Sequence, residues 1–216
     1  MRGIDITNFD VVGAEIIGIP KGDDKESCIS AFEETVDIEV PRPKRRGDLV
    51  ITSQGRKFVY LKGKDIPGFA DQGAIDLGVA GTDSLDTYGS RPDLRSQVIG
   101  EPMCRLVLMS EEDRAEELRG RLQAQRWGST MAVATPLPGI LNAFAAWRDL
   151  PIRSAELPSG MSVSGSIEAM PILLKRWGVE LVADRVASGE TARENGLVEL
   201  MPIMNIYPAL VQKVEE

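Results

Sequence analysis

The chain has 216 residues, a formal net charge of −8, and 43% hydrophobic and 27% charged residues. This composition is typical of a soluble globular protein with one large domain or two small lobes, and the acidic balance argues against a general nucleic-acid binder, which needs surplus Lys and Arg. The sequence contains no histidine, which excludes a His-based catalytic triad and the commonest zinc ligand.

Short β-rich runs alternate with helical stretches along the chain, a pattern that predicts an α/β protein with mostly parallel sheets. In the first half, strands are predicted over residues 16–19, 49–52, 58–61 and 74–83, the last leading into a glycine-flanked acidic loop. A helix of about two turns is expected to begin near Asp65, because Asp as N-cap with Pro67 in the first turn favours a helix start.

The second half repeats the alternation. Strands are predicted over residues 104–109, 129–134, 152–157, 179–186 and 197–201, and helices over 111–123, from the 135–139 loop to 147, and from the 164–166 loop to 177. The boundary between the lobes is predicted near Gly100-Glu101-Pro102. We therefore expect a first lobe of residues 1–101 plus 197–216 and a second of residues 102–196, with a ligand cleft between them.

Two further features of the sequence bear on the cellular compartment of the protein. Cys28 and Cys104 are too few for a disulfide scaffold, and we expect both to be buried. No apolar run approaches the ~18 residues that cross a bilayer, and the N-terminus lacks the layout of a signal peptide. The expected location is cytoplasmic.

Three loops that follow strands of the second lobe are small, hydroxyl-bearing and helix-initiating: Thr135–Gly139, Ser164–Ser166 and Ser188–Thr191. Open α/β sheets bind ligands at this side of the strands, so the three loops suggest a polyphosphate site. Unpaired N–H groups at a helix start, with the helix dipole, favour an anion at Ser188, Gly189 and Thr191. Asp184 at the strand end would reach a sugar hydroxyl or a metal, or would cap the following turn.

Six blocks in chain order carry a resemblance to a known family: Pro20-Lys21-Gly22, residues 64–69 with Asp-Ile-Pro, residues 73–83 with Asp-Leu-Gly, Cys104-Arg105-Leu106, residues 165–171 with Gly-Ser-Ile-Glu, and residues 191–199 with Glu-Asn-Gly-Leu. In these blocks the chain resembles ATP phosphoribosyltransferase. Because the chain ends soon after the last block, it is expected to be the short form, without a C-terminal regulatory domain.

The resemblance implies a fold, a reaction and partners. The fold is the two-lobed α/β architecture of type II periplasmic binding proteins, with a cleft between the lobes. In the reaction, N1 of the ATP adenine displaces pyrophosphate from 5-phosphoribosyl-1-pyrophosphate, with Mg²⁺ on the leaving group and no metal ligand assigned in the chain. The expected partners are further copies of the chain and a regulatory subunit similar to histidyl-tRNA synthetase; nucleic acid and membrane are not expected.

The resemblance also assigns site residues. Lys21, Lys62 and Asp184 are the expected catalytic residues, the two lysines neutralising charge on the pyrophosphate. The phosphoribosyl group is assigned to Asp184, Ala187, Ser188, Gly189, Glu190 and Thr191. ATP is assigned to Gly81, Asp83, Thr135, Ser166 and Glu168.

Alternative interpretations remain for several of these residues and for the function. Lys21 could be a solvated loop lysine, and Glu168 could be a first-turn helix acid that responds to the dipole. Asp23-Asp24 replace the Arg-Leu that follows Pro-Lys-Gly in the family. The basic residues Arg42, Lys44, Arg45 and Arg46 either supply the missing cation or form a solvated hairpin tip. The alternative function is a non-catalytic nucleotide-binding or phosphate-binding or regulatory protein on the same scaffold; a solute-binding module is disfavoured because no secretion signal is present.

Overall fold

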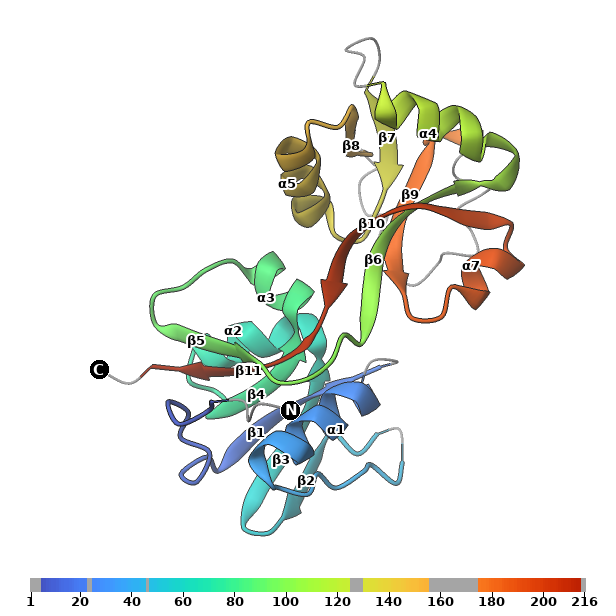
Figure 1. Ribbon diagram of the computed structural model, residues 1–216. Helices are drawn as coiled ribbons and strands as arrows, with labels where there is room; N and C mark the ends of the chain where they lie inside the picture. Colours follow the sequence, from blue (N-terminus) through green and yellow to red (C-terminus); the bar gives the residue numbers. More distant parts are fainter. Residues whose placement is uncertain (1–4, 23–24, 46, 125–129, 156–174, 215–216) are drawn as a thin grey trace. The chain divides into compact units, whose positions relative to one another are not determined.

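A computed structural model describes residues 5–22, 25–45, 47–124, 130–155 and 175–214 of the chain. The chain forms two compact units, Met1–Met103 with Ile206–Glu216, and Cys104–Asn205 (Figure 1). The second unit is therefore one continuous segment, and the first is made of two. The return to the first unit at Ile206 comes later than the predicted residue 197, because Leu197–Ile206 is a strand of the second unit's sheet.

The first unit is a sheet with helices on both faces. Its elements are β1 (Ile16–Lys21), α1 (Lys25–Val36), β2 (Val50–Ser53), β3 (Arg56–Lys62), the 3₁₀ turn η1 (Gly63–Asp65), α2 (Ile66–Asp71), β4 (Leu77–Gly81), α3 (Thr82–Tyr88), β5 (Leu94–Val98) and β11 (Pro208–Lys213). The strand order is β2-β3-β1-β4-β11-β5. β1 is parallel to β3 and β4, whereas β2 is antiparallel to β3, and β11 is antiparallel to both β4 and β5.

Alternation along the strands decides which helix covers which face. Ile17 and Ile19 of β1 are fully buried in a cluster with Cys28 and Phe32 of α1. Ile16 faces the other way and packs with the cluster around Ile66 of α2. Successive side chains of a strand point to opposite faces, so both faces of this sheet are covered. Cys28 and Cys104 are buried, as expected.

The second unit is also a sheet between helices. Its elements are β6 (Cys104–Glu111), the 3₁₀ turn η2 (Glu112–Arg114), α4 (Ala115–Gln123), β7 (Met131–Ala134), α5 (Pro138–Arg148), β8 (Ile152–Ser154), β9 (Leu181–Val186), α7 (Glu190–Glu194) and β10 (Leu197–Ile206). The strand order is β10-β6-β9-β7-β8, with β7 parallel to β8 and β9, and β6 antiparallel to β9. Apolar residues of α4 and α5 pack on one face, and Ala192 of α7 packs on the other.

The predicted α/β class with two lobes is confirmed, and each predicted strand has a counterpart in the structure. Several details differ. The sheets are mixed rather than mostly parallel, and residues 82–83 begin helix α3, where the end of a strand leading into a loop was expected. Helix α1 and strands β5 and β11 were not predicted. The helix expected from Ser164 falls outside the described residues as far as 174. Among the described helices, none combines the length and apolar character needed to span a membrane.

We predict that Leu210→Ala in β11 lowers the free energy of unfolding of the first unit by about 2–5 kcal/mol, because a cavity would form in its core. Leu210 is fully buried and lies between Val79 of β4 and Gln97 of β5. Urea unfolding followed by hydrogen exchange of β1 and β4 peptides measures the effect. Val12→Ala is the control because Val12 is 88% exposed; equal midpoints for the two variants would contradict the prediction.

Candidate functional site

Two lysines lie side by side where parallel strands of the first unit end. Lys21 of β1 is the register partner of Lys62 of β3, and both side chains are exposed. Among the ion pairs found in the described part of the chain, none includes either lysine. Two adjacent positive charges repel each other unless an anion lies near them, so this edge of the sheet favours a polyanion.

The next parallel strand, β4, ends at the same edge with Gly81, and Asp83 lies in the first turn of α3. Asp83 is only 1% exposed, and a Cβ atom at residue 81 would come within 2.4 Å of its Oδ1. Glycine is therefore required at position 81 for the carboxylate to fold back over the strand end. Thr82 fixes this turn, because its N–H donates to the carbonyl of Tyr207 (2.9 Å) and its hydroxyl accepts from the Tyr207 N–H (3.1 Å).

In the second unit, Asp184 lies within β9 rather than at its end. The strand continues to Val186, because Arg105 to Met109 of β6 pair with Val186 to Val182. Asp184 shares a sheet face with its partner Val107, a member of the buried apolar cluster. Burial raises the pKa of Asp184, while the hydrogen bond from the Arg185 N–H (2.7 Å) and the Arg185 charge lower it in part. The ionised carboxylate is therefore short of hydrogen-bond donors.

The loop after β9 contains the predicted phosphate-binding residues. Gly189 has a φ of +77°, a conformation that favours glycine, and the Ser188 hydroxyl accepts from the Glu190 N–H at 3.3 Å. Ala187, Ser188 and Gly189 donate no backbone hydrogen bond to another described residue. Helix α7 has five residues, so its dipole contributes little. Any anion bound here depends on the loop amides and on nearby side chains.

A cavity of about 270 Å³ lies against this loop, walled by apolar side chains of β6, β9 and α7. Its polar lining includes Ser188, Arg105, Arg193 and Glu199. The Arg105 guanidinium donates to both carboxylate oxygens of Glu199, at 3.2 and 3.1 Å. The sequence assigned no role to these three charged residues. Arg105 and Glu199 stand in two of the blocks that carry the resemblance, but nothing local reveals that they pair across 94 residues.

Thr135 follows β7, which is parallel to β9, so it lies at the same edge of the sheet as the loop after β9. The Thr135 side chain is nearly buried, and its hydroxyl oxygen accepts from the Leu137 N–H at 3.1 Å, forming a turn before α5. The other two predicted ATP-binding residues of this unit, Ser166 and Glu168, lie outside the described residues.

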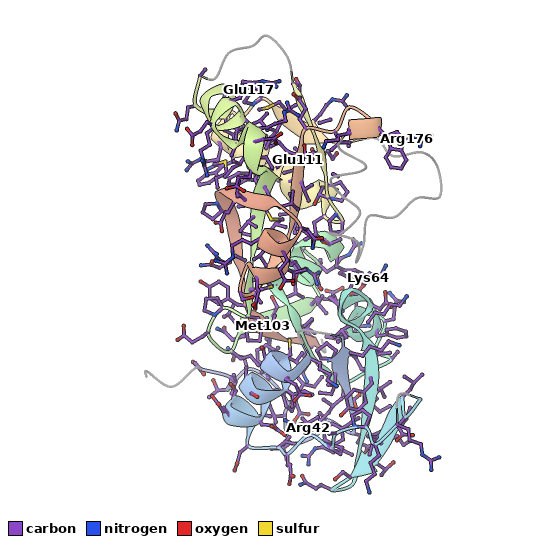
Figure 2. The ribbon with its side chains drawn as sticks, turned by 90° about the vertical axis from the view of Figure 1, so that its right-hand side faces the viewer. Arg42, Lys64, Met103, Glu111, Glu117 and Arg176 are labelled. Carbon is purple, nitrogen blue, oxygen red and sulfur yellow. The ribbon has the colours of Figure 1, made fainter. Side chains whose placement is uncertain are left out.

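The basic cluster at residues 42–46 is only partly open to a ligand. Arg42 is bound to Glu33 of α1 and to the Val40 carbonyl, and its Nε lies 3.6 Å from Glu26 (Figure 2). The hydrogen bond from Arg42 lowers the pKa of Glu33. Arg42 therefore fastens its loop to α1, while Lys44 and Arg45 are exposed, and Arg46, like Asp23 and Asp24, lies outside the described residues. Within the described ranges, no group of three or more Cys, Asp and Glu side chains is arranged to hold a metal ion.

The family profile and the curated relatives agree on one family. The profile described as HisG, ATP phosphoribosyltransferase, matches residues 62–216. The ATP phosphoribosyltransferase of Moorella thermoacetica is 29% identical over 90% of this chain and 82% of its own length, and that of Syntrophotalea carbinolica is 31% identical over 89% and 82%. The solved ATP phosphoribosyl transferase (HisG:HisZ) complex from Thermotoga maritima has a similar fold, with a TM-score of 0.63, 22% identity, and coverage of 92% of this chain and 87% of that one.

We predict that Asp184→Asn raises the melting temperature at pH 7 by a few degrees. The pKa of Asp184 is raised above 3.8 on folding, so the native state loses stability as the pH rises from below 3.8 through the folded pKa. Asn keeps the acceptor for Arg185 and removes the charge; 1 kcal/mol shifts the melting temperature by roughly 2–4 °C in a chain of this size.

Calorimetry across pH 3.5–7 checks the sign, since the difference between variant and wild type should grow with pH. Asp93→Asn, at an exposed aspartate of the first unit, is the control. A variant that is less stable than the wild type at pH 7, or a difference that does not change with pH, would refute the interpretation.

Proposed function

The chain belongs to the ATP phosphoribosyltransferase family of histidine biosynthesis, and we propose that it joins ATP to 5-phosphoribosyl-1-pyrophosphate through the residues described above. N1 of the adenine attacks C1 of the ribose, the C1–O bond to pyrophosphate breaks, and phosphoribosyl-ATP and pyrophosphate are the products. Because adenine N1 already carries a lone pair, the step needs no strong general base. The chain's task is to hold two polyanions and to stabilise the leaving pyrophosphate.

The second unit is proposed to bind the phosphoribosyl part of the donor at Asp184 and the loop from Ala187 to Thr191. The amides of Ala187, Ser188 and Gly189 support this assignment, because they have no acceptor among the described residues. Asp184 is suited to ribose hydroxyls, since its partly buried carboxylate gains donors that it otherwise lacks. Thr191 and Glu190 are exposed beside the amides. The hydroxyl of Thr191 can donate to a phosphate, whereas the Glu190 carboxylate has to point away from it.

The first unit is proposed to stabilise the pyrophosphate through Lys21 and Lys62. Their adjacency in the parallel register is the observation that carries this assignment. Both charges are in place before the reaction, so they stabilise the negative charge that develops on the leaving group. Mg²⁺ is proposed to arrive on the donor's pyrophosphate, where it would neutralise part of the same charge.

The ATP-binding assignment is proposed for Gly81, Asp83, Thr135, Ser166 and Glu168. The supporting observations are that Gly81 and Asp83 lie at the edge of the sheet that carries the lysines, and that Thr135 follows a strand parallel to β9. The Thr135 hydroxyl accepts from Leu137 but still has a hydrogen to donate.

The chain is further proposed to be the catalytic subunit of a short-form enzyme, assembled with other copies of itself and with a regulatory subunit like histidyl-tRNA synthetase. The similarity in fold to a chain of the HisG:HisZ complex from Thermotoga maritima supports this proposal. A cytoplasmic location is proposed because ATP and the phosphoribosyl donor are made there. The alternative, a non-catalytic protein on the same scaffold, is decided by the assay below.

We predict that purified chain, given ATP, donor and Mg²⁺, releases pyrophosphate, with the regulatory subunit added in a parallel reaction. Lys62→Gln should lower kcat/KM for the donor roughly 10- to 100-fold, because a charge-assisted hydrogen bond contributes about 1.5–3 kcal/mol. Lys57→Gln is a matched control: Lys57 is exposed on the same strand, at its opposite end. Equal loss in the two variants would reject the assignment of Lys62, and no pyrophosphate release in either reaction would favour the non-catalytic alternative.

A further inference from the structure

The cavity beside the loop at residues 187–189 contains more positive than negative charge. Arg105 and Arg193 line it together with one carboxylate, Glu199. Glu199 is fully engaged, since both of its oxygens accept from Arg105. Arg193 is exposed and takes part in no ion pair within the described part of the chain. The cavity lining therefore includes one arginine that has no ion-pair partner among the described residues, in a chain whose net charge is −8.

The position of Arg193 is fixed relative to the loop. Its backbone N–H donates to the carbonyl of Gly189 at 3.2 Å, and its own carbonyl accepts from Gly196 at 3.0 Å. Ser188 and Gly189 line the same cavity. Arg193 thus follows the loop by a single helical turn and lines the same cavity as Ser188 and Gly189.

An anion at this loop needs a side-chain cation. The five-residue α7 supplies little dipole, and Glu190 adds a negative charge at its first position. Arg105 is already neutralised by Glu199. The volume of about 270 Å³ is several times the ~30 Å³ of a water molecule, so a phosphate group with bound water fits. A planar guanidinium can donate two parallel hydrogen bonds to a phosphate.

We propose that Arg193 is a further binding residue for the donor, and that its guanidinium pairs with the 5′-phosphate in this cavity. The proposal rests on the assignment of the phosphoribosyl group to the 187–191 loop. The new element is that the phosphate lies on the cavity side of the loop, with Arg193 as its charge partner. Arg105 does not serve as that partner, because it is paired with Glu199. Arg193 would then select donors that carry a 5′-phosphate over those that lack one.

Titration calorimetry with two separate probes tests the proposal. Ribose 5-phosphate has the 5′-phosphate of the donor but no pyrophosphate. Inorganic pyrophosphate is the leaving group alone, without the ribose or its 5′-phosphate. Arg193→Gln should weaken ribose 5-phosphate binding roughly 10- to 100-fold and reduce its salt dependence, with pyrophosphate binding unchanged. Arg193→Lys should recover part of the affinity. Arg148→Gln, at an exposed arginine of α5 that does not line this cavity, should match the wild type.

A second variant separates the failure of this proposal from the failure of the proposed function. Gly189→Val forces a β-branched residue into a φ of +77° and distorts the loop. If Gly189→Val loses ribose 5-phosphate binding and Arg193→Gln does not, the loop assignment stands and the role of Arg193 is overturned. If the wild type does not bind ribose 5-phosphate, or both variants bind it normally, the loop assignment itself is wrong and the role of Arg193 falls with it.

Discussion

The parallel pairing of β1 with β3 is the constraint on which the chemistry proposed for the first unit depends. Ile17 and Ile19 of β1 and Phe58 of β3 are fully buried, and these apolar positions fix the register of the two strands. The same register brings Lys21 and Lys62 together where the strands end. A slip of one residue would expose the apolar side chains and separate the lysines, so the hydrophobic pattern that stabilises the sheet also positions the charges.

The anion contacts proposed for the two units differ in kind. The first unit offers two flexible ammonium groups at a strand edge, and the second offers backbone amides whose direction is set by the left-handed Gly189. Side-chain ammonium groups can follow a leaving group as it moves. Amides held by a strand and a helical turn cannot, and they suit a group that stays in place through the reaction. Asp184 fits the second kind of site, because its carboxylate is partly buried and held within a strand before any ligand arrives.

The sequence predicts the strands well because apolar runs ending in Gly, Ser or Thr carry that information locally. It does not predict that β11 lies antiparallel between β4 and β5, because strand order depends on contacts between distant segments. The sequence does not reveal ion pairs for the same reason. Arg42 was expected to be either a cation available to a ligand or part of a solvated hairpin tip, and it is bound to Glu33. Arg105 and Glu199, which pair between β6 and β10, lie far apart in the chain. The loop at 187–191 could be proposed from the sequence alone because its glycine and hydroxyl residues adjoin each other in the chain.

The place of β11 has a consequence for how the protein is made. Residues 208–213 fill the gap between β4 and β5, yet they leave the ribosome only after the whole of the second unit. Until then β4 and β5 each present an unpaired strand edge, whereas the second unit, a continuous segment, already has all its strands. The first half of the chain is thus the last to finish folding. Loss of residues 208–213 would leave a nascent first unit open to aggregation beside a completed second one.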